Sequence, residues 1–305
     1  MDFIRPFFEG KHWIVQILCL LLFVIVGIIV FSGLGYLVDY LAFKTMDMNE
    51  AANPAAFVRI SQTFASIGVF LVPSLLFAFC NDKKWLHYNA ADRKPHYLLV
   101  NVTLLLSIVI LPLVAGLAGW NQSLHLPDSL YKVERWMVNM EEQADYILRL
   151  MTFDHTYGTL MANIIVMAVA PAVCEEFLFQ GTIQRFMHKR NWNPHLCIWL
   201  TGFIFSTIHL EFFGFVPRFL LGVYLGYLYY WSRSLWLPIL AHFLHNALSL
   251  LVTFTLEGRG VLVDDMKITD IHGSNIMLLT CTLVTAMSLV FMWKVQKEFN
   301  QTEWE

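Results

Sequence analysis

Residues 157–182 read YGTLMANIIVMAVAPAVCEEFLFQGT, an apolar run that contains two adjacent acids, Glu175 and Glu176. A helix needs about 20 such residues to cross the roughly 30 Å hydrocarbon core of a bilayer. The run is therefore long enough to span a membrane. Ionisable side chains are costly at that depth, so the two glutamates are candidates for a functional role.

The composition of the whole chain points the same way. Of 305 residues, 57% are hydrophobic and 14% are charged, whereas a soluble domain carries about 25% charged residues. This excludes a soluble globular protein and a disordered chain. The net charge is −3 and no basic tract is present, so a nucleic-acid partner is excluded as well. We expect an all-α polytopic membrane protein, embedded in the lipid bilayer, with residues 1–305 forming a single membrane domain.

The apolar residues fall in blocks that predict about eight transmembrane helices. The predicted spans are 12–38, 60–80, 97–119, 157–182, 195–213, 218–232, 235–255 and 274–294. An even number of spans places both termini on one side. The connecting segments of that side hold more Lys and Arg, and those of the other side hold most of the acids. The positive-inside rule then places both termini in the cytoplasm.

Residues 120–156 are expected to be extracytoplasmic and to include an amphipathic helix. Within 126–153, apolar residues recur at steps of three and four, which is typical of a helix with one apolar face. Such a helix either lies along the outer interface of the membrane or packs on the protein's own helices.

Two further spans carry polar groups. The fifth contains FSTIH (205–209), and the seventh contains PILAHFLHN (238–246). His242 and Asn246 are four residues apart, so they share one helical face and can point into a common cavity. His245 points about 60° away from His242, and we assign it a structural role.

The adjacent glutamates cannot share one role, because consecutive helical residues point about 100° apart. One of Glu175 and Glu176 is expected to face a polar cavity inside the membrane, and the other a neighbouring helix. A glutamate can take a proton from water that a histidine orients. A histidine and an asparagine can stabilise the oxyanion that forms on an attacked carbonyl. The same groups could instead bind a divalent metal such as zinc, with Glu175, His209 and His242 as ligands, and no HExxH motif is present to decide between the two.

At these residues the chain resembles the CAAX prenyl protease and bacteriocin-processing (CPBP, or Abi) family of intramembrane proteases. The resemblance is closest over 155–255, the motif-bearing catalytic core. The family patterns EExxxR, FxxxH and HxxxN match at Glu175 and Glu176, at Phe205 and His209, and at His242 and Asn246.

This resemblance implies an eight-helix protease with a cavity open to the cytoplasm and to lipid. It implies that Glu175 and His209 activate water, that His242 and Asn246 form the oxyanion site, and that Glu176 supports them. A glutamate-type mechanism and a metal-dependent one are both compatible with the family.

The chain departs from the family at one position, because Gln180 stands where EExxxR has arginine. An arginine there would pair with Glu176 at i+4. The departure favours an alternative in which the protein has reduced catalysis and binds a membrane partner or confers bacteriocin immunity. A transporter is less favoured, because the sequence has no internal repeat.

We expect an intramembrane endopeptidase that acts on a protein or peptide. The absence of organelle signals favours a bacterial inner membrane, where a leader peptide or a membrane-protein segment is a more plausible substrate than a prenylated tail. The sequence indicates neither the substrate nor the oligomeric state.

Overall fold

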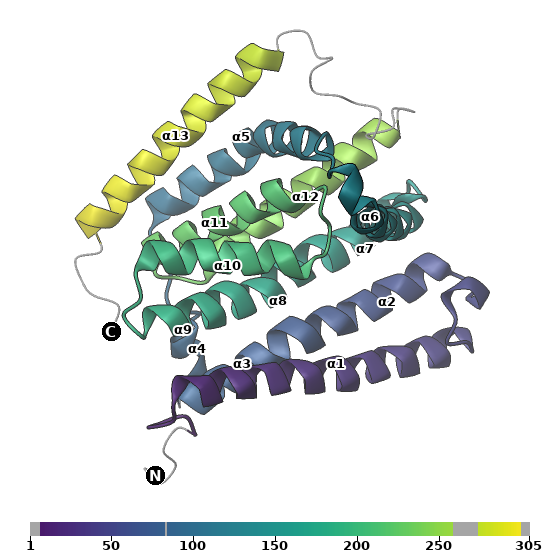
Figure 1. Cartoon of the computed structure of the whole chain (residues 1–305), viewed down its shortest axis with the longest axis horizontal. Coiled ribbons are helices and arrows are strands. Elements are labelled where there is room, and N and C mark those ends of the chain that lie inside the picture. The colour runs from purple at the N-terminus through teal and green to yellow at the C-terminus, as the bar shows by residue number, and fades with distance from the viewer. Residues whose placement is uncertain (1–6, 83, 259–273, 300–305) are drawn as a thin grey trace.

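A computed structural model describes residues 7–82, 84–258 and 274–299. No strand occurs within these ranges, and helices form at all eight predicted positions (Figure 1). They are α1 (Trp13–Phe43), α2–η2–α3 (Pro54–Asn81), α5 (Tyr97–Gln122), α7–η4–α8–η5–α9 (Tyr157–His188), α10 (Pro194–Ile208), α11 (Phe215–Ser232), α12 (Trp236–Glu257) and α13 (Ser274–Phe299). Short helices, η1 (Met48–Glu50), α4 (Trp85–Tyr88) and η3 (Asp128–Leu130), lie in the connections.

The protein is a multi-pass membrane protein. In the described part of the chain, six helices are long and apolar enough to cross a bilayer, and α10 is a shorter apolar helix. The apolar side chains of α1 and α13 are largely exposed, as expected for surfaces that contact lipid. Helix α11 is different, because Leu221, Leu225 and Leu228 are buried among other helices. An interior helix contacts little lipid, which accounts for its lower hydropathy.

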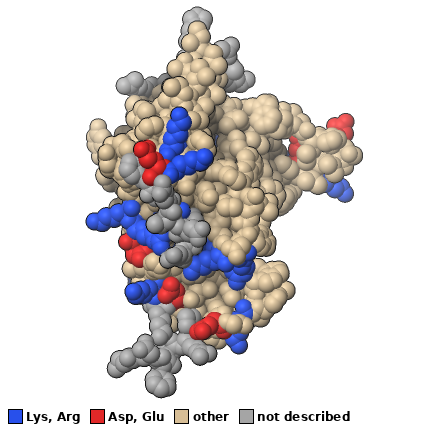
Figure 2. All heavy atoms as spheres, turned by 90° about the vertical axis from the view of Figure 1, so that its left-hand side faces the viewer, with Lys and Arg blue, Asp and Glu red and all other residues tan. Residues whose placement is uncertain are grey.

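Successive helices cross the bundle in alternating directions, so the start of α1 and the end of α13 lie on the same face, at the left in Figure 1. We call this the terminal face. Figure 2 looks onto it and shows that Lys and Arg side chains gather there.

Helices α10 and α11 approach each other closely at a pair of glycines. A Cβ atom on Gly222 would lie 3.0 Å from Cα of Gly202, and one on Gly202 would lie 2.9 Å from the backbone nitrogen of Val223. Small residues allow this contact between backbones, which is typical of helix packing in membranes. The contact brings α11 against the C-terminal half of α10, where the FxxxH pattern lies.

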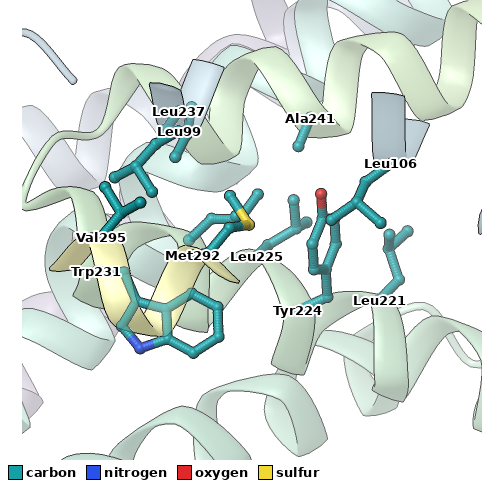
Figure 3. Close-up of a cluster of buried hydrophobic side chains, with 11 residues drawn as sticks. Leu99, Leu106, Leu221, Tyr224, Leu225, Trp231, Leu237, Ala241, Met292 and Val295 are labelled. Carbon is teal, nitrogen blue, oxygen red and sulfur yellow. The ribbon is translucent and has the colours of Figure 1, made fainter. Parts of the chain in front are cut away.

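A buried apolar cluster joins the helices of the C-terminal half. It combines Leu99 and Leu106 of α5 with Leu225 of α11, Ala241 of α12 and Met292 of α13 (Figure 3). This packing fixes α12, which carries the HxxxN pattern, against α5 and α11.

The amphipathic segment forms α6 (Tyr131–Thr152), as predicted. Its C-terminal end packs on the protein's own helices, while most of its other side chains are exposed. The Met151 carbonyl at its C-terminal end accepts hydrogen bonds from Arg59 (2.8 Å) and Asn163 (2.9 Å). Helix α6 therefore lies at the end of the bundle opposite the terminal face.

Candidate active site

The glutamates lie on a short α-helix, α8 (Ala170–Leu178), between two π-helical segments, η4 (Ile164–Val169) and η5 (Phe179–Gln184). π-Helical turns often mark functional sites. Pro171 contributes to the irregularity, because proline lacks the N–H that would bond the carbonyl four residues earlier. That carbonyl belongs to Met167, and it accepts a hydrogen bond from Nδ2 of Asn246 at 3.2 Å. The proline thus leaves a backbone acceptor free to hold Asn246.

His209 lies beside Glu175. The fifth predicted span was too long, since α10 ends at Ile208 and His209 is its C-cap. Carbonyls in the last turn of a helix lack intrahelical partners. The Nδ1–H of His209 donates to one of them, the Phe205 carbonyl, at 2.7 Å. In the neutral imidazole this bond leaves the lone pair on Nε2, and Nε2 lies 3.8 Å from Oε2 of Glu175.

Glu176 points to a different neighbour. It is fully buried, and its Oε1 accepts a hydrogen bond from Nδ1–H of His242 at 2.9 Å. Glu175 instead borders a cavity, so the expected divergence of the two side chains is confirmed. Among the described residues, Oε2 of Glu176 and both polar atoms of Gln180 have no partner at hydrogen-bond distance. Gln180 also carries no charge, so it does not neutralise the Glu176 carboxylate.

The ring of Phe205 lies between the two imidazoles. Its centroid is 5.0 Å from that of His209 and 5.9 Å from that of His242. The phenyl ring therefore packs against both imidazoles. The three patterns thus meet in one place.

A cavity of about 550 Å³ contacts all the predicted site residues except Glu176. Its other lining comes from the parts of the chain farthest from the terminal face. These are the end of α5, Leu148 of α6, the α10–α11 loop and the second half of α12. Arg218 and Glu211 form an ion pair at this end.

The cavity lies toward the end of the bundle opposite the terminal face. The resemblance implies instead a cavity open to the cytoplasm, the side on which the sequence places the termini. His245, assigned a structural role, also lines the cavity, and its Nδ1 has no partner among the described residues. The cavity contacts a broad face of α12, and His245 lies on that face.

Comparison with known proteins agrees with this site. Residues 157–248 match the family described as Type II CAAX prenyl endopeptidase Rce1-like. The predicted resemblance to CAAX proteases is confirmed. We call the matched residues, 157–248, the Rce1-like segment, and this segment contains every predicted site residue.

A curated relative, the uncharacterized protein YpbD of Bacillus subtilis (strain 168), is 28% identical over 89 residues. The match covers 28% of this chain and 42% of that protein, so the chain spans less than half of the relative. No solved structure matches the chain.

A buried polar network that the sequence did not predict joins Ser74 and Asn89 to the Rce1-like segment. Ser74 of α3 donates to the Phe177 carbonyl at 2.7 Å and contacts the Thr182 hydroxyl, also at 2.7 Å. Asn89 donates to Ser74 at 3.1 Å. A Cβ atom on Gly181 would lie 3.2 Å from Asn89, so the glycine makes room for this amide. These bonds fix the π-helical turn that follows the glutamates.

The site residues do not form a ready metal centre. In the described ranges, no three His, Cys, Asp or Glu side chains are grouped so that they could hold a metal ion. Nδ1 of His209 and Nδ1 of His242 are both used in hydrogen bonds to the protein. These bonds leave both Nε2 atoms available, which is the usual arrangement of zinc-binding histidines, so the metal-dependent mechanism stays open beside the direct one.

Proposed function

We propose that the protein is an intramembrane endopeptidase that uses Glu175 and His209 to activate water. The observation that carries the proposal is their separation of 3.8 Å at the edge of a cavity. That distance is too long for a direct hydrogen bond, but one water molecule about 2.8 Å from each atom can contact both.

The bonding of His209 fixes how this water would lie. Because Nδ1–H is committed to the Phe205 carbonyl, Nε2 accepts a hydrogen bond from the water. The carboxylate of Glu175 accepts the second. Both water hydrogens are then held by the protein, so an oxygen lone pair points toward the substrate carbonyl. Glu175 takes a proton as the carbon–oxygen bond forms, and later gives it to the leaving amine as the peptide bond breaks.

His242 and Asn246 are placed to stabilise the oxyanion of the tetrahedral intermediate. One amide hydrogen of Asn246 is bonded to the Met167 carbonyl, and the other remains to donate. His242 donates to Glu176 through Nδ1, so its Nε2 donates to the oxyanion only in the imidazolium form. We assign Glu176 the role of counter-ion to that form. Such donors contribute a factor of about 10²–10³ to rate.

The position of the cavity determines how a substrate would reach it. The cavity lies toward the end of the bundle opposite the terminal face, near α6 and the Glu211–Arg218 pair. With the basic terminal face in the cytoplasm of a bacterium, the substrate would enter from the outer half of the inner membrane. A leader peptide or a membrane-protein segment on that side fits this route.

The second candidate is a family member that binds a membrane partner with reduced catalysis. The unpaired atoms of Glu176 and Gln180 favour it. His242 already supplies one partner for Glu176, and for this reason we place the protease first.

The test is cleavage of a peptide library by the purified protein in H₂¹⁸O, read by mass spectrometry. Hydrolysis places one ¹⁸O in each new carboxylate. Glu175→Gln and His209→Ala are expected to lower the rate by about 10²–10⁴, while Glu142→Gln, an exposed glutamate of α6, keeps the wild-type rate.

Chelators separate the two mechanisms. The direct mechanism predicts the same rate with and without EDTA or phenanthroline. Loss of activity that zinc restores would replace it with a metal-dependent one. Full activity of Glu175→Gln would remove the proposed base, and no cleavage by wild-type protein would favour the partner-binding alternative.

A further inference from the structure

A second cavity, of about 580 Å³, lies on the terminal face, at the opposite end of the molecule from the candidate active site. Its lining comes from the start of α1, the end of α3, α4 and the segment after α9. Three of the lining side chains are cations, namely Lys11, Lys189 and Arg190. No lining residue is acidic.

The cations of this basic cavity have little local compensation. In the described part of the chain, no carboxylate forms an ion pair with any of the three. Burial, together with the nearby Arg185, lowers the pKa of Lys189 to about 8, against a smaller opposing effect of Asp82. The positive charge around the cavity therefore comes from its lining residues and also from Arg185, which lies nearby but does not line it.

The cationic groups are held in position. Arg190 lies over the Phe186 ring at 3.4 Å, donates to the Phe186 carbonyl at 2.8 Å and donates to Oε1 of Gln16, also at 2.8 Å. Gln16 is itself buried, and it donates to the Lys11 carbonyl. The ammonium of Lys189 lies 4.4 Å from the centre of the Tyr88 ring. This preorganisation lowers the entropy cost of binding an anion.

The depth of the cavity indicates the source of that anion. Trp13 and Trp192 line it and are each 44% exposed, and tryptophans of this kind mark the headgroup level of a bilayer. The lining residues lie at the helix ends that meet the terminal face, and Figure 2 shows the Lys and Arg side chains of that face. Basic pockets between membrane helices bind phosphate groups of lipids.

We propose that this cavity binds the phosphate of an anionic phospholipid headgroup, held by Lys11, Lys189 and Arg190. The lipid would tie α1 to the segment after α9 and so brace the first helix against the Rce1-like segment. The proposal is independent of the proposed function, since the cavity shares no residue with the candidate active site.

The experiment measures lipid binding to the full-length protein in detergent. Phosphatidylglycerol is titrated and bound lipid is counted by native mass spectrometry, with phosphatidylcholine and inorganic phosphate as parallel titrations. At about 1 kcal/mol for each cation near a lipid surface, Lys189→Gln is expected to weaken phosphatidylglycerol binding about fivefold. The triple variant Lys11→Gln/Lys189→Gln/Arg190→Gln is expected to weaken it about 100-fold.

The matched control is Lys44→Gln/Lys132→Gln/Arg135→Gln, which removes three cations from the other end of the molecule and is expected to bind phosphatidylglycerol as the wild type does. Binding of inorganic phosphate as tight as that of phosphatidylglycerol would overturn the lipid assignment. Phosphatidylglycerol binding that persists in the triple variant, or equal binding of phosphatidylcholine, would overturn the site itself. The single Lys189→Gln variant keeps the test decisive if the triple variant fails to fold.

Discussion

Adjacent residues acquire different roles here because each meets a different helix. Glu175 borders the cavity next to His209, and Glu176 is buried against His242. Helical geometry predicts that the two diverge, since it depends on spacing alone. It does not predict which neighbour each would meet, because His209 and His242 come from distant helices.

Glu176→Gln tests the counter-ion role. Glutamine still accepts the hydrogen bond from His242 but carries no charge to stabilise the imidazolium. We expect the ¹⁸O-labelled product to form about 10²-fold more slowly, with the folded structure retained in circular dichroism spectra. A rate equal to that of the wild type would show that His242 acts without its counter-ion.

Gln180→Arg tests the departure from the family pattern. The guanidinium would pair with Oε2 of Glu176, which now lacks a partner, in a charge-assisted hydrogen bond. We expect the cleavage rate to rise about tenfold. Gln180→Met, which removes the amide without adding charge, is the control and should leave the rate near that of the wild type. A lower rate in Gln180→Arg would show that Gln180 is adapted to this chain.

At the scale of helices, Pro171 affects Asn246 through the Met167 carbonyl, which accepts a hydrogen bond from that side chain. In Pro171→Ala the restored N–H can bond the Met167 carbonyl within the helix, in competition with Asn246. We expect activity to fall by about tenfold with stability unchanged or higher. Added to Asn246→Ala, the change should have almost no further effect, which a double-mutant cycle measures. Additive losses of activity in the double variant would show that Pro171 and Asn246 act independently.

The contact between α10 and α11 depends on glycine. In Gly222→Ala the new methyl group would lie 3.0 Å from Cα of Gly202, so the helices must separate. We expect a loss of about 1–3 kcal/mol in the free energy of unfolding, seen as a lower Tm. Gly33→Ala is the control, because a Cβ there meets nothing within 4 Å and alanine favours the helix. An unchanged Tm in Gly222→Ala would contradict the tight contact.

Helix positions were largely predictable, and helix irregularities were not. Length and hydropathy located all eight helices, because lipid contact demands apolar blocks. The π-helical turns depend on the network of Ser74, Asn89 and Thr182, whose members are separated by up to 108 residues. No local pattern marks such a network. The HxxxN motif was predictive because its two polar groups share one helical face.

At the scale of the whole molecule, the order and direction of the helices determine the end of the bundle toward which the cavity lies. The sequence predicts the sidedness of the termini through its charges, but the depth of each polar group depends on helix tilt and on where α10 ends. The cavity lies toward the end opposite the terminal face. If the basic terminal face is cytoplasmic, as the positive-inside rule requires, the cavity lies toward the outer leaflet, and the proposed protease would act on substrates there.

Labelling of single cysteines in a cysteine-free variant tests this orientation in intact bacterial spheroplasts. Asp128→Cys lies at the α6 end of the bundle, and Asp92→Cys lies at the terminal face between α4 and α5. A membrane-impermeant maleimide is expected to label Asp128→Cys in intact spheroplasts and Asp92→Cys only after lysis. The reverse pattern would place the cavity toward the cytoplasm, and the basic face would then violate the charge rule. Because both cysteines lie in short connections between helices, the contrast reports sidedness rather than burial, and it decides from which compartment a substrate can enter.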